Sequence, residues 1–108
     1  MSSQVRIRGS IDSTTQAIQA ALINYLVAHP SADIELYRRN SVSVRIRIVD
    51  PGFHGLDQVD RHEQVWQYLD NLPEDVVSDI SMVVLLTRQE TAESLANLEF
   101  EDASRTLI

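Results

Sequence analysis

The segment 33–50, DIELYRRNSVSVRIRIVD, constrains the fold more than any other part of this chain, because polar and apolar residues alternate along two stretches of it. Such alternation predicts two strands, each with one buried face, and the polar residues between them predict a tight turn. With the turn centred on Asn40, the cross-strand pairs are Leu36 with Val44, Ile34 with Ile46, Glu35 with Arg45, and Asp33 with Arg47. This register gives one apolar face and one face of opposite charges, whereas a turn centred between Arg39 and Asn40 gives mixed faces. We therefore expect an antiparallel hairpin in the first register.

An apolar sheet face needs helices to cover it, and an amphipathic helix is predicted on each side of the hairpin. Residues 13–28 carry apolar side chains at helical spacing, and Asp12 and Ser13 compete as the N-cap; Ser13 would form a capping box with Gln16. Residues 57–71 repeat the pattern, and a proline then ends that helix before one further helical turn at 73–79.

Three more segments complete the chain. Residues 4–8 alternate as a short strand, and residues 80–87, ISMVVLLT, are apolar on both faces and predict a strand covered on each side. Thr87 and Glu90 fit a capping box ahead of a last helix at 88–98. The side chains expected to anchor this helix and the chain after it are Ala92, Leu95, Ala96, Leu98 and Phe100.

The order of these elements predicts an α+β fold. The stretch from 42 to 87 is a strand, a helical crossover and a strand, so the two strands should be parallel. We expect a single domain over residues 1–108, built on a three-stranded mixed sheet covered by helices. Its core is residues 13–87, with strand 4–8 as a candidate fourth strand and helix 88–98 as a C-terminal addition.

Charge and composition narrow the function. The formal net charge is −7, all nine basic residues are Arg, and residues 62–108 hold ten acids against two Arg. Clustered positive charge supplies most nucleic-acid affinity, so this balance is adverse to nucleic-acid binding. The candidate nucleic-acid face is limited to Arg6, Arg8, Arg45 and Arg47. The chain has no Cys and no apolar run of about 18 residues, so we expect a soluble cytoplasmic protein without disulfides or membrane spans.

The sequence carries no motif typical of catalysis. It has three Gly, none in a G-x-G arrangement, and no nucleophile-elbow sequence. We therefore expect that the protein is not an enzyme.

One histidine stands out within VDRHEQVWQYL, residues 59–69. His62 follows the apolar spacing of Val59, Val65, Trp66, Leu69 and Leu72, while Arg61 and Glu63 are expected to point away. His62 is thus either a partly buried core residue or a ligand. A metal site with His54 and Asp50, Asp57 or Asp60 is the alternative, although no ligand spacing supports it.

The segment 43–87 resembles the core of BolA-like proteins, in which an apolar strand is followed by a Phe-x-Gly loop and a helix beginning with Arg-His. The matching residues here are Phe53, Gly55, Arg61, His62, Val65, Trp66, Leu69, Leu85 and Thr87. The element order of residues 13–87 is also similar to the α-β-β-α-α-β order of that family, which is related to class II KH-like folds.

The resemblance implies a small non-enzymatic adaptor that pairs with a monothiol glutaredoxin and shares a [2Fe–2S] cluster with it. By that correspondence His62 is a cluster ligand, and Arg61, Phe53 and Gly55 belong to the partner contact. The family's second ligand lies between the first two core strands, where residues 39–41 here offer neither His nor Cys. Two alternatives remain: nucleic-acid binding through a KH-like face, and a structural module that self-associates through the N-terminal strand or the C-terminal helix.

Overall fold

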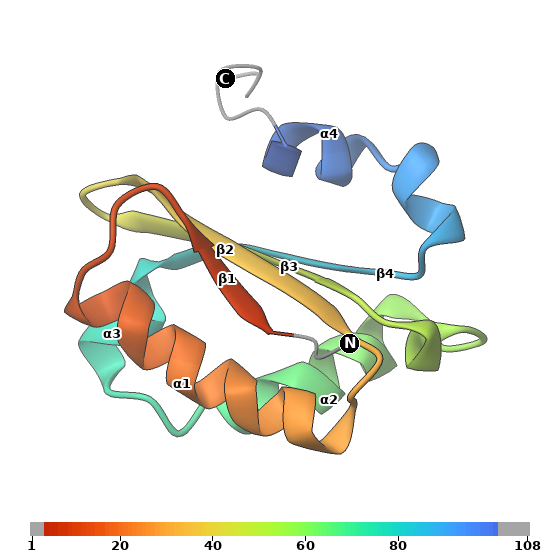
Figure 1. Cartoon of the computed structure of the whole chain (residues 1–108), viewed down its shortest axis with the longest axis horizontal. Coiled ribbons are helices and arrows are strands. Elements are labelled where there is room, and N and C mark those ends of the chain that lie inside the picture. The colour runs from red at the N-terminus through yellow and green to blue at the C-terminus, as the bar shows by residue number, and fades with distance from the viewer. Residues whose placement is uncertain (1–3, 102–108) are drawn as a thin grey trace.

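The hairpin forms the centre of a four-stranded mixed sheet in the computed structural model, which describes residues 4–101 (Figure 1). The strands are β1 (Val5–Arg8), β2 (Asp33–Asn40), β3 (Ser43–Val49) and β4 (Ile80–Leu86), and they are arranged in that order across the sheet. β2 and β3 are antiparallel, whereas β1 runs parallel to β2 and β4 runs parallel to β3. The α+β fold, the fourth strand and the parallel crossover are therefore confirmed.

The predicted hairpin register is wrong by two residues. Ile34 pairs with Ile48, and Glu35 pairs with Arg47, because the turn lies at residues 41–42 and the register shifts at a bulge between Arg38 and Asn40. Asn40 favours this turn, since its side-chain oxygen accepts a hydrogen bond from the backbone N–H of Val42 at 2.9 Å. A shift of two residues leaves every side chain on its predicted face, so the apolar face survives the error.

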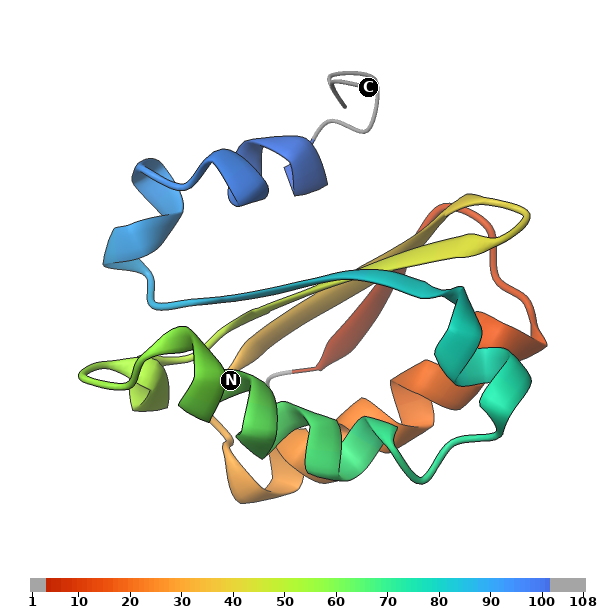
Figure 2. The same ribbon diagram turned by 180° about the vertical axis from the view of Figure 1, so that it is seen from behind.

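Two helices cover the apolar face of the sheet, as Figures 1 and 2 show from opposite sides. α1 (Ser13–Ala28) is capped by Asp12, not by Ser13, and Asp12 forms its capping box with Thr15. α2 (Gln58–Leu69) is capped by Asp57, and α3 (Glu74–Asp79) follows Pro73 as predicted. Between them and the sheet lies the main core, whose largest fully buried side chains include Tyr25, Phe53, Ile18, Leu22, Ile34, Leu36, Ile46, Ile48, Leu69 and Leu85.

The opposite face of the sheet is covered in part by the C-terminal segment (Figure 1). The single helix expected at 88–98 is instead a 3₁₀ helix (Gln89–Ala92) and the α-helix α4 (Leu95–Glu101). The expected anchors are also wrong in part, because Leu95 is 78% exposed and Leu98 is 49% exposed. Phe100 is buried as expected, and Asn97, which was not expected to be an anchor, is buried as well. The reason is the chemistry of the sheet beneath, where arginines and Tyr37 lie in contact with α4.

No helix within residues 4–101 is long and apolar enough to cross a membrane.

Candidate functional site

The loop after β3 is held in place by a buried carboxylate. Asp50 is 3% exposed, and its two oxygens accept hydrogen bonds from the Tyr25 hydroxyl at 2.7 Å and the Gly52 N–H at 2.8 Å. The ring of His29 stacks on Tyr25 with centroids 4.2 Å apart, and its Nδ1 lies 3.6 Å from Asp50. Sequence reasoning missed this cluster, because no spacing along the chain relates a helix residue to a loop residue 25 positions later.

The Phe-x-Gly loop follows directly. Phe53 ends a 3₁₀ helix (Pro51–Phe53) and is fully buried in the core, so it holds the loop rather than offering a partner contact. Gly55 has a φ of +82°, a left-handed conformation that favours glycine over residues with a Cβ. Gly55 itself is exposed.

Arg61 is the most tightly held charge in this region, and the expectation that it points to solvent is wrong. Its guanidinium is 4% exposed and donates to the Leu85 carbonyl at 3.0 Å and to both oxygens of Glu90 at 2.7 and 3.0 Å. Its Nε donates to the Leu56 carbonyl at 2.9 Å. Arg61 therefore ties α2, β4 and the chain after β4 together, which is a structural role.

The partner of Arg61 also contacts the backbone at the end of β4. Glu90 accepts the Thr87 N–H at 2.8 Å, which is one half of the predicted capping box. The Arg61 guanidinium and the Thr87 N–H stabilise the carboxylate form and lower the pKa of Glu90 to about 2. His62, the second residue of the Arg-His pair, has a different environment.

His62 is half-buried at the edge of a shallow, almost wholly apolar hollow on α2. We call this surface the α2 flank; its residues are Gln58, Val59, His62, Glu63 and Trp66. Burial lowers the pKa of His62, so the imidazole is neutral at pH 7, which is the form that binds metals and accepts protons. Val59, expected in the core, is 68% exposed and forms part of this hollow.

The α2 flank lies on the side of α2 that faces away from α1. Tyr68 marks the α1 side, because its ring packs edge-to-face on Tyr25 with centroids 5.4 Å apart. Helical spacing puts His62 and Trp66 on the other side. There β4 is the last strand of the sheet, and the Gln58 side chain donates to its Leu85 carbonyl at 3.3 Å. In Figure 2, α2 and β4 lie side by side toward the viewer.

The alternative metal site of His54, His62 and an aspartate is not formed. No group of three or more His, Cys, Asp or Glu side chains within residues 4–101 could hold a metal ion. His54 instead lines a different hollow with Pro51, Thr87, Arg88 and Gln89. The Asp50 carboxylate is occupied by Tyr25 and Gly52, and Asp57 caps α2.

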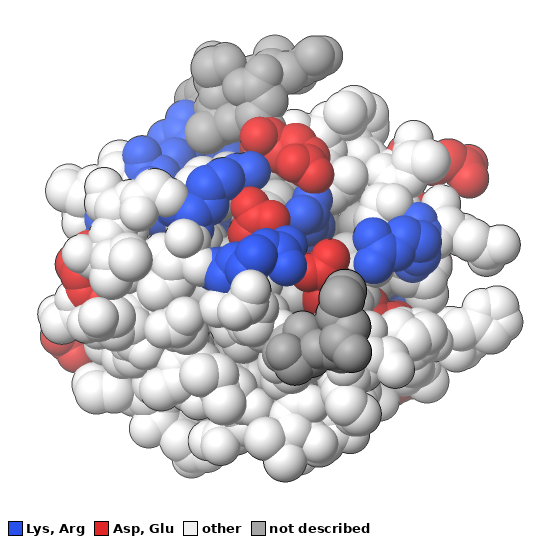
Figure 3. Space-filling model, in the orientation of Figure 1, with Lys and Arg blue, Asp and Glu red and all other residues white. Residues whose placement is uncertain are grey.

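The four arginines of the candidate nucleic-acid face do lie on one face of the sheet. The register places Arg6 and Arg47 on either side of Glu35, and Arg8 and Arg45 on either side of Tyr37. Acidic side chains lie among the basic ones over this part of the surface, whereas the surface below, over the charge-free α1, is white (Figure 3).

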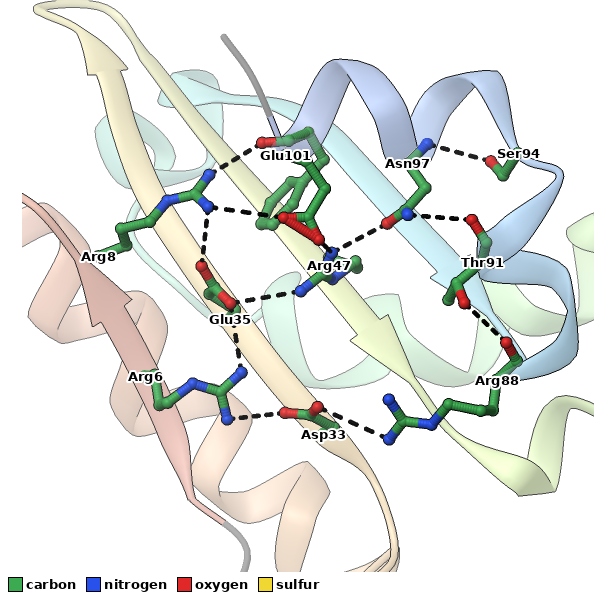
Figure 4. A network of polar contacts seen from close by, with 11 residues as sticks. Arg6, Arg8, Asp33, Glu35, Arg47, Arg88, Thr91, Ser94, Asn97 and Glu101 are labelled. Carbon is green, nitrogen blue, oxygen red and sulfur yellow. Dashed lines mark hydrogen bonds and ion pairs between the residues drawn. The ribbon is translucent and has the colours of Figure 1, made fainter.

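Figure 4 shows how these charges are paired. Arg6 contacts Asp33 at 2.8 Å, and Glu35 lies within 3.3 Å of the guanidiniums of Arg6, Arg8 and Arg47. Part of the face is also covered by α4. A phosphate backbone would have to displace these contacts, so the face is not an open basic surface.

Comparison with protein-family models, with curated proteins and with solved structures gives no match for this chain.

Proposed function

We propose that this protein is a small non-enzymatic adaptor of the BolA-like type, which binds a protein partner through the α2 flank. The observation that carries the proposal is the exposed apolar hollow around His62, on a chain whose net charge is −7. In this hollow the exposed Val59 and the half-buried Trp66 present apolar surface that a partner would cover, with polar residues beside them. Gln58 and Glu63 provide such polar residues at the edge of the hollow.

The arrangement of the elements also supports this proposal. From α1 to β4 the order is helix, strand, strand, helix, helix, strand, with the hairpin antiparallel and the last strand parallel to β3. This is the order that the resemblance to BolA-like proteins implies for residues 13–87. The two residues of the Arg-His pair also have different roles, which suits an adaptor. Arg61 fixes α2 to the sheet, and His62 lies at the surface.

A monothiol glutaredoxin carrying a [2Fe–2S] cluster is the partner that we propose. A neutral, half-buried imidazole suits one ligand position of such a cluster. The α2 flank offers no second His or Cys, so the glutaredoxin and its thiols would supply the other ligands.

The test is to mix the protein with a cluster-loaded monothiol glutaredoxin and to record visible circular dichroism. We expect a changed spectrum for the wild type, no change for His62→Ala, and a wild-type response for the control His54→Ala, whose ring lies in the loop. If the wild type leaves the spectrum unchanged, the cluster role is wrong.

Partner binding is tested separately from cluster binding. Val59→Asp puts a charge into the apolar hollow and should weaken the complex by about tenfold or more, with or without the cluster. Titration calorimetry with apo-glutaredoxin measures this effect, and Glu63→Gln is the matched control at the edge of the same hollow. Equal affinity of wild type and Val59→Asp would show that the partner binds elsewhere.

A further inference from the structure

On the face of the sheet opposite the α2 flank, three arginines hold α4 through hydrogen bonds. Phe100 lies at the centre of this contact; it is 0% exposed and clusters with Tyr37, Val84 and Leu86. The Tyr37 ring lies edge-on to Phe100 with centroids 5.0 Å apart, and the guanidinium carbons of Arg47 and Arg8 lie 4.8 and 5.3 Å from the Phe100 centroid. Such cation–π contacts select an aromatic ring over an aliphatic side chain. We call Arg8, Tyr37 and Arg47, together with Arg45, which contacts the next turn of α4, the arginine cage.

The cage also recognises the end of a helix. Arg8 donates to the Phe100 carbonyl at 2.9 Å, and Arg45 donates to the Glu99 carbonyl at 3.0 Å. The last carbonyls of a helix have no partner within it and carry the negative end of its dipole, so guanidinium groups suit them.

Side-chain contacts add a preference for particular residues on the helix. Arg47 binds the Asn97 side-chain oxygen at 2.9 Å and pairs with the Glu101 carboxylate. Figure 4 shows Arg8 and Arg47 directed toward Glu101 from two different strands. The site is thus complementary to an acidic helix in which a phenylalanine directly precedes an acidic residue.

The cage is held by the sheet independently of its occupant. Glu35 contacts Arg8 at 3.2 Å and Arg47 at 3.3 Å, and Arg45 donates to the Tyr37 hydroxyl at 3.3 Å. All five residues lie on strands β1, β2 and β3. The receptor should therefore keep its shape when α4 leaves.

The occupant is a short helix anchored by one aromatic ring. α4 has seven residues, and isolated helices of that length are unstable in water. Phe100 is its only fully buried apolar side chain, while Leu95 and Leu98 face away from the sheet. A segment with this attachment can exchange with a competitor of the same chemistry.

We propose that the arginine cage is a binding site for an acidic helical segment of another protein, with a phenylalanine near its C-terminal end, and that α4 occupies it in cis. A competing segment has to displace α4, so its apparent affinity is its intrinsic affinity multiplied by the fraction of molecules in which α4 is undocked. This site is separate from the α2 flank and does not depend on the glutaredoxin proposal.

The experiment uses the full chain and a fluorescein-labelled peptide matching residues 94–101, titrated by fluorescence anisotropy. Phe100→Ala removes the cis anchor and leaves the cage intact, so it should bind the peptide at least about tenfold more tightly than the wild type. Leu98→Ala is the matched control, because this side chain is on the outer side of α4 and its loss should leave the affinity at the wild-type value. The double variant Phe100→Ala/Arg47→Gln should bind the peptide no more tightly than the wild type.

The peptide itself provides the specificity control. A peptide with Ala in place of Phe100 should not bind Phe100→Ala protein. The proposal is wrong if folded Phe100→Ala protein binds neither peptide, binds both equally, or binds a labelled single-stranded oligonucleotide in preference to them.

A second measurement covers the case in which Phe100→Ala does not fold. At millimolar concentrations of unlabelled peptide, wild-type protein should show faster amide hydrogen exchange in α4, with unchanged exchange in β2 and β3. Unchanged exchange in α4 at these concentrations would equally overturn the proposal.

Discussion

At the scale of single residues, Arg61 and His62 show how two neighbours acquire different roles. Successive residues of a helix point about 100° apart, so two neighbours can meet different surroundings. Arg61 takes the buried position because carbonyls and a carboxylate satisfy its donors there. His62, without such partners, lies at the edge of the apolar hollow on the outer side of α2.

The ion pair of Arg61 and Glu90 gives a pH-dependent prediction. The folded pKa of Glu90, about 2, lies below its ordinary value of 4.5, so the pair stabilises the fold above about pH 4.5. This stabilisation is lost as the pH falls from 4.5 toward 2. Glu90→Gln should lower the free energy of unfolding at pH 7 by about 1–3 kcal/mol. In this variant the free energy of unfolding should also fall less steeply between pH 4.5 and pH 2 than in the wild type. Urea unfolding at several pH values measures both effects.

The control for this prediction is Glu93→Gln, because Glu93 is exposed three residues further along. It should keep the wild-type stability and its pH dependence. An equally steep fall in the free energy of unfolding for wild type and Glu90→Gln between pH 4.5 and 2 would contradict the role of the ion pair.

The buried Asp50 gives a second prediction at this scale. Burial, and then the hydrogen bond to Asp50, raises the pKa of Tyr25, so its phenol stays protonated and continues to donate. Its stabilising effect is complete below about pH 10, the ordinary pKa of tyrosine, and is lost as the pH rises further. Tyr25→Phe should cost about 1–3 kcal/mol at pH 7, since the buried carboxylate loses a donor. Thermal unfolding checks this, with Tyr68→Phe as the control that leaves Asp50 its donor.

At the scale of elements, the alternating and helical patterns identified the strands and helices, but α4 shows the limit of such patterns. Hydrophobicity alone favours Leu95 and Leu98 as buried side chains as much as Phe100, and only Phe100 is buried. The surface beneath α4 is formed by arginines and Tyr37, which suit an aromatic ring and a helix end better than leucine. Which face of α4 is buried is thus decided by residues far away in the sequence.

Two substitutions on α4 test whether its leucines or its phenylalanine form the buried face. Leu95→Glu should change the free energy of unfolding by no more than about 0.5 kcal/mol, because the side chain is exposed. Phe100→Ala should destabilise the protein, but by less than the about 3–5 kcal/mol typical of a phenylalanine removed from a closed core, because α4 can leave the sheet. Urea unfolding measures both, and the reverse order of effects would mean that α4 packs through its leucines.

At the scale of the whole molecule, the sheet separates two surfaces of different chemistry. The α2 flank is apolar and belongs to a helix that covers one face of the sheet. The arginine cage is charged and lies on the other face. Sites that are far apart and share no side chains usually respond additively to substitution.

The two sites should therefore act independently. His62→Ala should leave binding of the 94–101 peptide to Phe100→Ala protein unchanged. Phe100→Ala should likewise leave the affinity for a glutaredoxin within about twofold of the wild-type value. Paired titrations of the double and single variants measure the coupling, and a coupling above about tenfold would show that the sheet transmits an effect between its faces.

The sequence by itself determined the order of the elements, the α+β class, the apolar face of the hairpin and the boundaries of α1. These follow from local propensity and from periodicity, which neighbouring residues carry. Only the tertiary structure decided the hairpin register, the burial of Arg61, the pairing of the four arginines and the orientation of α4. Each of these depends on partners distant along the chain, such as the Leu85 carbonyl for Arg61 and Glu35 for Arg47, and no local pattern records which donors and acceptors will meet.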